Sequence, residues 1–329
     1  RIESAEQILR LALAYGFCGL SLRQTAAWAE SAGIVSISDV ALLKRLRKSS
    51  SWLGHLVATK LAARSGSRPR FPLQLVLVDA STVNAPGNTG IDWRVHLGFD
   101  LGNFQIRDIT LTDVRGGEAL RRYHIETGDV VVADRGYSRR TDLAAVNSMG
   151  GDFLVRLNWK GVPLIHQDGR SFDLVGAARS IPEATVGEFN LKLKPDPKQN
   201  VPSIPVRLIA VRKSEAAAEV ARIKTLRRCS KQQKLPDPRT LEMAAYVFIA
   251  TSLPASQISA NEVLEVYRFR WQVELVFKRL KSLIDLDGLP AKDADLAKAF
   301  LYSKILAALL LDDFTNAFVS FSPWGFVVA

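Results

Sequence analysis

The sequence has few of the residues that build disulfide frameworks or zinc sites, and it has no long apolar run. Its 329 residues include two cysteines, Cys18 and Cys229, and four histidines that are spread along the chain. Two distant cysteines cannot form a zinc site and are typical of a reduced cytoplasmic protein. The most apolar stretch, 305–311, is far shorter than the roughly 20 residues of a transmembrane helix. We therefore expect a cytoplasmic protein.

Acidic residues are scarce relative to basic ones. The chain has 44 Lys and Arg against 33 Asp and Glu, a formal net charge of +11. Residues 1–70 hold eleven Lys and Arg and only four Asp and Glu, so most of the excess lies there. A basic balance of this size indicates a polyanionic partner such as nucleic acid. The length and the 47% apolar content predict a substantial core, divided over two or three domains.

The most informative pattern lies near the C-terminus, in one predicted helix that follows a capping box at Ser259. At 100° per residue, four charged side chains and a tyrosine fall within about 80° of one another, and apolar residues occupy roughly the next 120°. The five are Tyr267, Arg270, Glu274, Lys278 and Lys281. A carboxylate flanked by cations suits a site that holds a metal ion and a phosphate chain. The alternative is an exposed helix with i,i+4 pairs.

Two short, strongly apolar segments upstream each end on an aspartate. Residues 73–79 end on Asp79, and residues 129–134 end on Asp134. Both segments are rich in β-branched residues and are predicted to be buried strands. An unpaired carboxylate at the end of a buried strand is costly, and a hard divalent cation would justify it. Either aspartate alone is more often a cap or turn residue, but together with Glu274 they favour a Mg²⁺ site.

At this point the chain resembles a known family. The spacing Y-x2-R-x3-E-x6-K, which begins at Tyr267, is similar to the C-terminal motif of insertion-sequence transposases of the family numbered four. Segments 78–82 and 134–137 resemble its two aspartate motifs, and the resemblance extends through 92–100 and 111–118. It implies an RNase H-like core whose three carboxylates hold two Mg²⁺ ions, with Mn²⁺ as a substitute. The three carboxylates are those of Asp79, Asp134 and Glu274.

The resemblance also implies DNA contacts around this triad. Arg270 and Lys281 are expected to contact phosphates, and Tyr267 and Tyr137 to shape the site. The two tyrosines, Arg135 and Lys278 are further expected DNA contacts. The implied reaction is metal-dependent cleavage at transposon ends followed by transfer of the 3′-hydroxyl into target DNA. We expect a homodimer on double-stranded DNA, associated with the bacterial nucleoid. Two alternatives stay open: an RNase H-like endonuclease without strand transfer, and a retired transposase that only binds DNA.

Residues 1–70 are predicted to form a helical N-terminal domain. Segments 21–30 and 38–48 each begin with a serine cap and are separated by a short turn of small residues, a pattern that fits a helix-turn-helix. Its basic residues are then expected to contact DNA. The alternative is a helical buttress whose basic residues are only solvated. These residues are Lys44, Arg45, Arg47 and Lys48.

The order of elements favours an α/β (α+β) fold, with an RNase H-like mixed sheet and helices on both faces. The first part of the catalytic core is predicted over 71–159 and the second over 245–329. Its strands are expected at 73–83, 93–101, 103–113, 129–134, 153–157 and 246–251, with helices at 118–125 and 139–149.

An insertion domain is predicted over 160–244. It is expected to be mostly β, with a basic helix at 214–233 that either grips DNA or is merely solvated. Chemistry at a duplex end usually displaces a base onto an aromatic ring. Trp159, Tyr246 and Trp271 are candidates for that ring, each with a core position as the alternative. Tyr246 is the preferred one, because it lies where the insertion rejoins the catalytic sheet.

Overall fold

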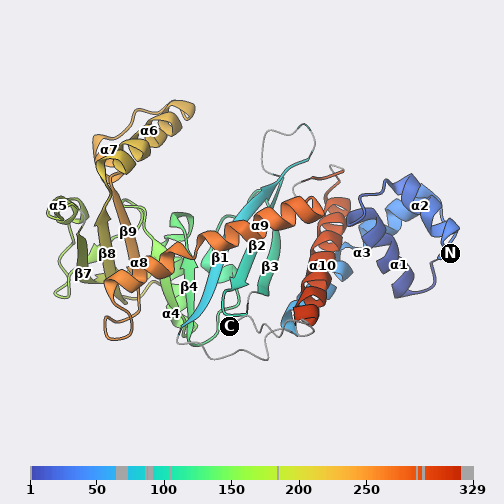
Figure 1. Ribbon diagram of the computed structural model, residues 1–329, viewed down its shortest axis with the longest axis horizontal. Coiled ribbons are helices and arrows are strands. Elements are labelled where there is room, and N and C mark those ends of the chain that lie inside the picture. The colour runs from blue at the N-terminus through green and yellow to red at the C-terminus, as the bar shows by residue number, and fades with distance from the viewer. Residues whose placement is uncertain are drawn as a thin grey trace.

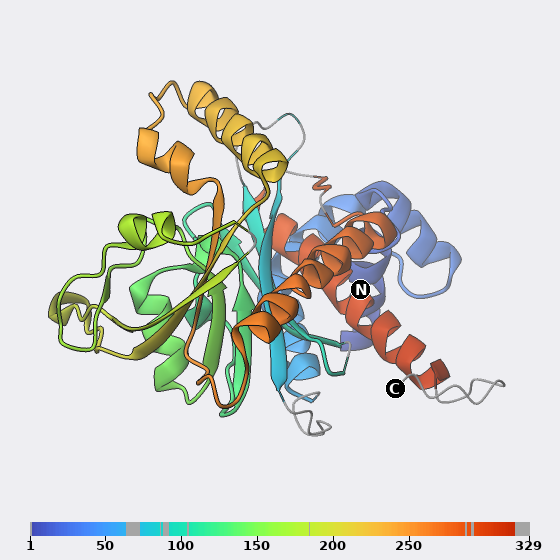
Figure 2. The same ribbon diagram turned by 60° about the vertical axis from the view of Figure 1, so that its left-hand side comes forward.

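The computed structural model describes residues 2–63, 73–85, 87, 92–103, 105–183, 185–286, 288–290 and 293–319. Nine strands of this part of the chain form one mixed sheet in the order β3-β2-β1-β4-β5-β9-β8-β7-β6. Helices cover both faces of the sheet, and a helical layer lies beyond its β3 edge (Figure 1, Figure 2). The predicted α/β (α+β) class with a mixed sheet is confirmed.

Five of the strands form the RNase H-like half of the sheet. Three consecutive strands pair antiparallel, and two later strands add in parallel beside the first. These strands are β1 (Gln74–Val83), β2 (Trp93–Asp100), β3 (Gln105–Asp113), β4 (Asp129–Ala133) and β5 (Asp152–Arg156). Their Val- and Ile-rich sequences suit a pleated surface that is packed on both sides. The five strands follow one another along the chain in the order expected from the sequence.

Alternate residues of these strands enter two hydrophobic cores, one on each face. Leu77 and Val132 pack on the face that α8 (Ala260–Arg268) and α9 (Trp271–Ile284) cover. Val78 and Val131 pack on the opposite face, with α4 (Arg140–Ser148). This alternation determines on which side of the sheet each strand-end residue points.

Two predicted helices are wrong in extent. The helix expected over 118–125 is only a 3-10 turn, η1 (Leu120–Arg122), which lacks a side-chain cap and ends at the extended residue Tyr123. The single helix expected through Glu274 is two helices, α8 and α9. Between them Arg270 N donates to Tyr267 O at 3.1 Å, a bond of the tighter i to i−3 type. The two helices follow one another across the sheet (Figure 1).

The strands of residues 160–244 extend the core sheet. These are β6 (Leu164–Ile165), β7 (Val186–Leu193) and β8 (Pro205–Arg212). The next strand, β9 (Tyr246–Thr251), pairs antiparallel with β8 on one side and with β5 on the other. The insertion and the core therefore share one continuous hydrogen-bonded sheet. The domain boundaries at 160 and 244 stay a prediction.

Three helices accompany these strands: α5 (Leu174–Arg179), α6 (Glu215–Lys231) and α7 (Pro238–Met243). The segments α6 and α7 project beyond the sheet as a pair (Figure 1, Figure 2). A single α6 side chain, Ala218, is buried, so this helix rests on the body of the protein only near its first turns.

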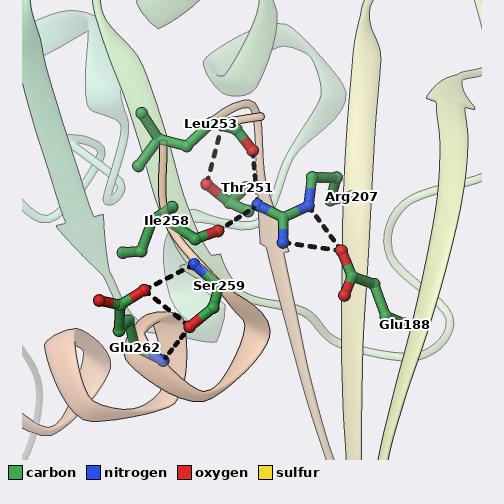
Figure 3. Close-up of polar contacts among 7 residues, drawn as sticks. All are labelled: Glu188, Arg207, Thr251, Leu253, Ile258, Ser259 and Glu262. Carbon is green, nitrogen blue, oxygen red and sulfur yellow. Dashed lines mark hydrogen bonds and ion pairs between the residues drawn. The ribbon is translucent and has the colours of Figure 1, made fainter. Parts of the chain in front are cut away.

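A buried arginine joins the insertion strands to the start of α8 (Figure 3). Arg207 on β8 donates from Nη1 to the carbonyl oxygens of Leu253 at 2.9 Å and Ile258 at 3.0 Å. Its Nε also donates to Glu188 Oε1 on β7 at 2.8 Å. Directly after this loop, Ser259 forms the predicted capping box of α8. Strand β8 therefore determines where the helices that lead to Glu274 begin.

The N-terminal helices pack against the last helix. They are α1 (Ala5–Gly16), α2 (Leu22–Ser31) and α3 (Asp39–Ala62), and the last is α10 (Ala294–Val319). Helix α3 is much longer than the predicted segment 38–48, and it lies along α10, where Lys60 pairs with Asp313. This packing supports the buttress interpretation, while DNA contact by α3 stays a prediction. No helix in the described residues is long and apolar enough to cross a membrane.

Candidate active site

The two aspartates lie on the face of the sheet that α9 covers. Asp79 comes two residues after Leu77 on β1, and Asp134 comes two residues after Val132, just past the end of β4. The backbone of Asp134 is still extended, so the alternation of the strand continues through it. Because β1 and β4 are neighbouring parallel strands, both carboxylates lie at the same region of the sheet.

The carboxyl group of Asp79 is strongly perturbed by its surroundings. Its pKa is raised to about 6, mainly by burial and also by the nearby charges of Asp134 and Glu274, while the Ala80 amide and Arg270 act in the opposite direction. The Ala80 amide donates to Asp79 Oδ1 at 2.9 Å. Asp79 therefore carries a carboxylate whose negative charge the protein alone does not fully stabilise.

Asp134 begins the short η2 turn (Arg135–Tyr137), where its Oδ1 accepts from Gly136 N at 2.7 Å. The Tyr137 hydroxyl lies 3.0 Å from that of Tyr123, which donates to the Asp79 backbone oxygen at 3.1 Å. This pair of tyrosines ties the two aspartate segments together. Tyr137 is fully buried, so its expected contact with DNA is wrong, whereas its position fits the expected role of shaping the site.

Glu274 lies in the first turn of α9, with its side chain 53% exposed. Its Oε1 pairs closely with Arg270, which is half-buried at the break between α8 and α9. The i,i+4 pair that the sequence offered as an alternative is thus present. Arg270 also lowers the pKa of Asp79, so the guanidinium lies near both carboxylates.

Within the described ranges, no three Asp, Glu, His or Cys side chains are close enough to hold one metal ion together. The chemistry of the donor set nevertheless fits a hard cation, because all three groups are carboxylates and Asp134 and Glu274 both raise the pKa of Asp79. For all three to bind a common metal centre, the Glu274 carboxylate has to turn away from Arg270.

A basic pocket of about 820 Å³ adjoins Asp134. On one side it is lined by residues at the ends of β4, β5 and β9 and by α7, and on the other by one stripe of α6, formed by residues 217, 220, 221, 224, 225 and 228. Six cationic side chains line it, and Asp134 is the single acidic residue that does so. The cations are those of Arg135, Arg156, Lys213, Lys224, Arg228 and Arg270.

The electrostatics of this pocket favour an anion. The pKa of Lys213 is lowered to about 8, mainly by burial and also by the charges of Arg156, Arg135 and Lys224. The Lys213 ammonium donates to the Ala244 carbonyl at 2.6 Å, which fixes it on the pocket floor. Cations held this close repel one another, and a phosphate chain would relieve that repulsion.

The basic cluster predicted on α6 divides into two groups. Lys224 and Arg228 line the pocket. Arg222 instead pairs with Glu215 at 2.6 Å and with Glu219 at 3.2 Å. Arg227, like Lys231, does not line the pocket. Only part of the cluster is therefore placed to act beside Asp134.

The remaining residues that were expected to contact DNA lie in three places: the pocket, helix α9 and helix α3. Tyr267 and Arg135 line the pocket, and Lys278 is exposed on α9 while Lys281 is partly buried. The four basic residues of α3 are exposed but belong to the helical layer beyond β3, away from α6 (Figure 1). They are Lys44, Arg45, Arg47 and Lys48, of which Arg47 pairs with Asp293 at 3.2 Å.

Tyr246, the preferred base-stacking residue, lines the pocket but is only 8% exposed, and its ring stacks on Phe248. Burial therefore counts against it, and base stacking stays a prediction. Trp271 is 50% exposed, and Trp159 lines the pocket beneath Lys160. The accessible aromatic faces beside the triad are therefore those of the two tryptophans and of Tyr267.

Sequence reasoning missed three charged residues near the triad. Arg156 is the last residue of β5, and Lys213 directly follows β8. Nothing in the local sequence of either residue distinguishes it from an ordinary solvated cation. Glu118 lies beside Asp134, and its pKa is raised by burial and by Asp134, against Arg94 and Arg139. The available signal was the pair of glycines before Glu118, which indicates a tightly packed turn.

Comparisons with known proteins identify the family of the chain. A family model described as "Transposase DDE domain" matches residues 70–310. The chain is 39% identical over 332 residues to the InsL protein of insertion sequence element IS186A of Escherichia coli (strain K12), a match that covers 98% of this chain and 88% of that protein. It is 38% identical over 333 residues to the transposase for insertion sequence element IS421 of Escherichia coli, with the same coverage of 98% and 88%.

Proposed function

The chain belongs to the DDE transposase family and is a DNA transposase, and we propose that it cuts the ends of an insertion sequence with Asp79, Asp134 and Glu274 as its catalytic carboxylates. One observation carries this assignment. Asp79 lies within β1 and Asp134 follows the end of the adjacent parallel strand β4, both on the face that α9 covers, and α9 presents Glu274 near enough to raise the pKa of Asp79. The freed 3′-hydroxyl groups then join target DNA.

We further propose two Mg²⁺ ions as cofactors, for which Mn²⁺ substitutes. Asp79 would contact both ions, Asp134 one and Glu274 the other. When bound, such a pair supplies an activated water and stabilises charge on the attacking and leaving oxygens. The protein contributes the positions of the three carboxylates, which the hydrogen bond between Tyr123 and Tyr137 and the packing of α9 hold in place.

Arg270 has a role that depends on Glu274. In the structure its guanidinium pairs with that carboxylate and also lies near Asp79. If Glu274 held a metal ion, Arg270 would lose its carboxylate partner and could bind a phosphate oxygen. Metal binding and DNA binding should therefore strengthen each other. Lys281, about two turns beyond Glu274 on α9, would contact a second phosphate of the same strand.

The basic pocket is the natural place for the DNA strand next to the cut. Its cations suit phosphates, while Trp159 and Tyr267 offer aromatic faces to an unpaired base. Lys224 and Arg228 would hold the strand from the α6 side, opposite Arg135 and the triad. We propose that the pocket takes nucleotides from the end of the duplex, and that Lys278 contacts the duplex outside it.

Further parts of the proposal concern the assembly. The partner is double-stranded DNA, both the transposon ends and the target, bound by a homodimer at the nucleoid in the cytoplasm. The basic residues of α3 would form a second contact region, far enough from α6 to reach another part of the DNA (Figure 1).

The test compares the amide variants Asp79→Asn, Asp134→Asn and Glu274→Gln with the natural protein on DNA that carries the element's own ends. Each variant should lose Mg²⁺-dependent nicking and keep its affinity in a gel-shift titration. A variant that still nicks appreciably removes that residue from the catalytic set.

A second assay addresses the two alternatives. It supplies pre-cut ends with free 3′-hydroxyls and scores their insertion into a plasmid. Nicking without insertion, across a range of end sequences, would favour an endonuclease. Binding without nicking by the natural protein would favour a retired transposase.

A further inference from the structure

The loop between β3 and η1 is fixed by more hydrogen bonds than a connecting loop requires. Gly116 O accepts from Arg94 Nη1 at 2.7 Å and from Thr112 Oγ1 at 3.2 Å. Gly117 O accepts from Arg122 Nε at 3.0 Å. Donors from β2, β3 and η1 thus hold two successive carbonyl groups, and the next residue, Glu118, is placed by them.

Two glycines allow Glu118 to approach Asp134. A Cβ on Gly116 would lie 2.2 Å from Thr112 Cβ, so the loop cannot take this path with any other residue there. A Cβ on Gly136 would lie 2.0 Å from Glu118 Oε2. The Glu118 carboxylate therefore packs directly on the backbone of the turn that follows Asp134.

The same geometry bounds the distance between the two carboxylates. The Cβ position of Gly136 lies 2.0 Å from Glu118 Oε2 and 3.0 Å from Asp134 Oδ1, so these oxygens are at most 5.0 Å apart. Arg94 and Arg139 are the cations that act on Glu118, but neither forms an ion pair with it within the described chain. Of the triad, Asp134 alone is among the charges that act on Glu118.

We propose that Glu118 is a positioning residue of the catalytic centre, which orients the water molecules of the metal ion bound by Asp134. The proposal rests on the proposed function, because it presumes a metal ion at Asp134. A carboxylate at this distance accepts hydrogen bonds from metal-bound water without displacing the other ligands. The rigid loop holds it there in advance, and its negative charge adds to the attraction for the cation.

The test measures metal affinity directly. Mn²⁺ is titrated into the DNA-free protein, and the unbound ion is followed by electron paramagnetic resonance. Glu118→Gln keeps the shape of the side chain and removes its charge, so affinity should fall about 10- to 100-fold, the range for residues that support metal ligands. Asp113→Asn is the matched control, because that exposed carboxylate caps the same loop through Arg115 N at 2.9 Å. It should change affinity less than twofold.

Gly136→Ala provides a second variant that keeps the charge. Its new methyl group would displace the flexible end of Glu118, so this variant should weaken Mn²⁺ binding as Glu118→Gln does. The two effects should not add in the double variant. In nicking assays, both variants should need about tenfold or more Mn²⁺ for half-maximal rate, while the rate at saturating Mn²⁺ changes only a few-fold.

Unchanged Mn²⁺ affinity in Glu118→Gln overturns the proposal, whatever happens to nicking. A loss of thermal stability with normal affinity also overturns it, since that outcome indicates a purely structural role. Two different results would count against the proposed function itself: the natural protein binds no Mn²⁺, or Glu274→Gln still nicks DNA.

Discussion

Removing the two pocket-facing cations of α6 should change how DNA binding responds to salt. The perturbation is the double variant Lys224→Ala/Arg228→Ala, and the control is Arg222→Ala/Arg227→Ala on the same helix. Both remove two positive charges. Only the first removes charges that line the pocket beside Asp134, because Arg222 is already paired with Glu215 and Glu219 and Arg227 lies outside.

The magnitude follows from the number of phosphates that the two side chains neutralise. Each neutralised phosphate contributes about 0.9 to the slope of log affinity against log salt for a duplex, and about 0.7 for a single strand. A variant that no longer neutralises two phosphates in the pocket should therefore show a slope shallower by about 1.4 to 1.8. At fixed low salt, removing each charge-assisted hydrogen bond to a phosphate should weaken binding roughly tenfold or more. The control should change the slope by much less, because its charges act only at long range and are screened.

The assay is a fluorescence-anisotropy titration at several salt concentrations, with a duplex end that carries a few unpaired nucleotides and the same end fully paired. If the pocket takes a single strand, the difference between the two variants should be larger on the unpaired end. Equal slopes for the two variants on both substrates would refute the reasoning, because the basic charge would then act only as a diffuse field.

Three further predictions concern the triad and its support. In metal-free buffer, Asp79→Asn and the natural protein should have equal free energies of unfolding below about pH 4. Because the pKa of Asp79 is raised to about 6 in the native state, the natural protein loses stability as pH rises from 4 to 6. At pH 7 the variant should therefore be more stable by up to about 3 kcal/mol, and Mg²⁺ should reduce this difference. Arg270→Ala and Lys281→Ala should slow joining of pre-cut ends about 10- to 100-fold, as single-turnover kinetics would report; losses below twofold would mean that these cations serve only the helix. Arg207→Met should lower the unfolding free energy in urea by about 3–5 kcal/mol, because the buried arginine is the donor to Glu188 and to two backbone carbonyls. Arg179→Met should cost at most about 1 kcal/mol, because the side chain of Arg179 is itself 61% exposed in its pair with Glu242.

The parts of the site that local sequence determines were predictable. Asp79 and Asp134 each follow a run of β-branched residues, and a buried strand of that kind is predictable from composition and length. The spacing from Arg270 to Glu274 placed both on one helical ridge, and they do pair across one turn. These features need no knowledge of distant contacts.

The parts that depend on distant contacts were not predictable. The break before α9 arises from tighter hydrogen bonds at residues 269–273, and the apolar pattern continues through it without interruption. Tyr246 looked accessible because it follows the insertion, but its place in a central strand buries it against Phe248. Glu118 meets Asp134 through a loop path that hydrogen bonds from three other elements determine.

The position of β9 has a consequence for the order in which the chain becomes active during synthesis. The ribosome releases β1, β4 and β5 first, with Asp79 and Asp134, and β5 then presents an open edge. That edge closes only when β9 arrives, and β9 needs β8 as its other neighbour. Glu274 follows still later, on helices whose starting loop Arg207 holds. Under the proposed triad, the chain acquires its third carboxylate only after the whole sheet is complete, so an interrupted translation product is expected to carry no cutting activity.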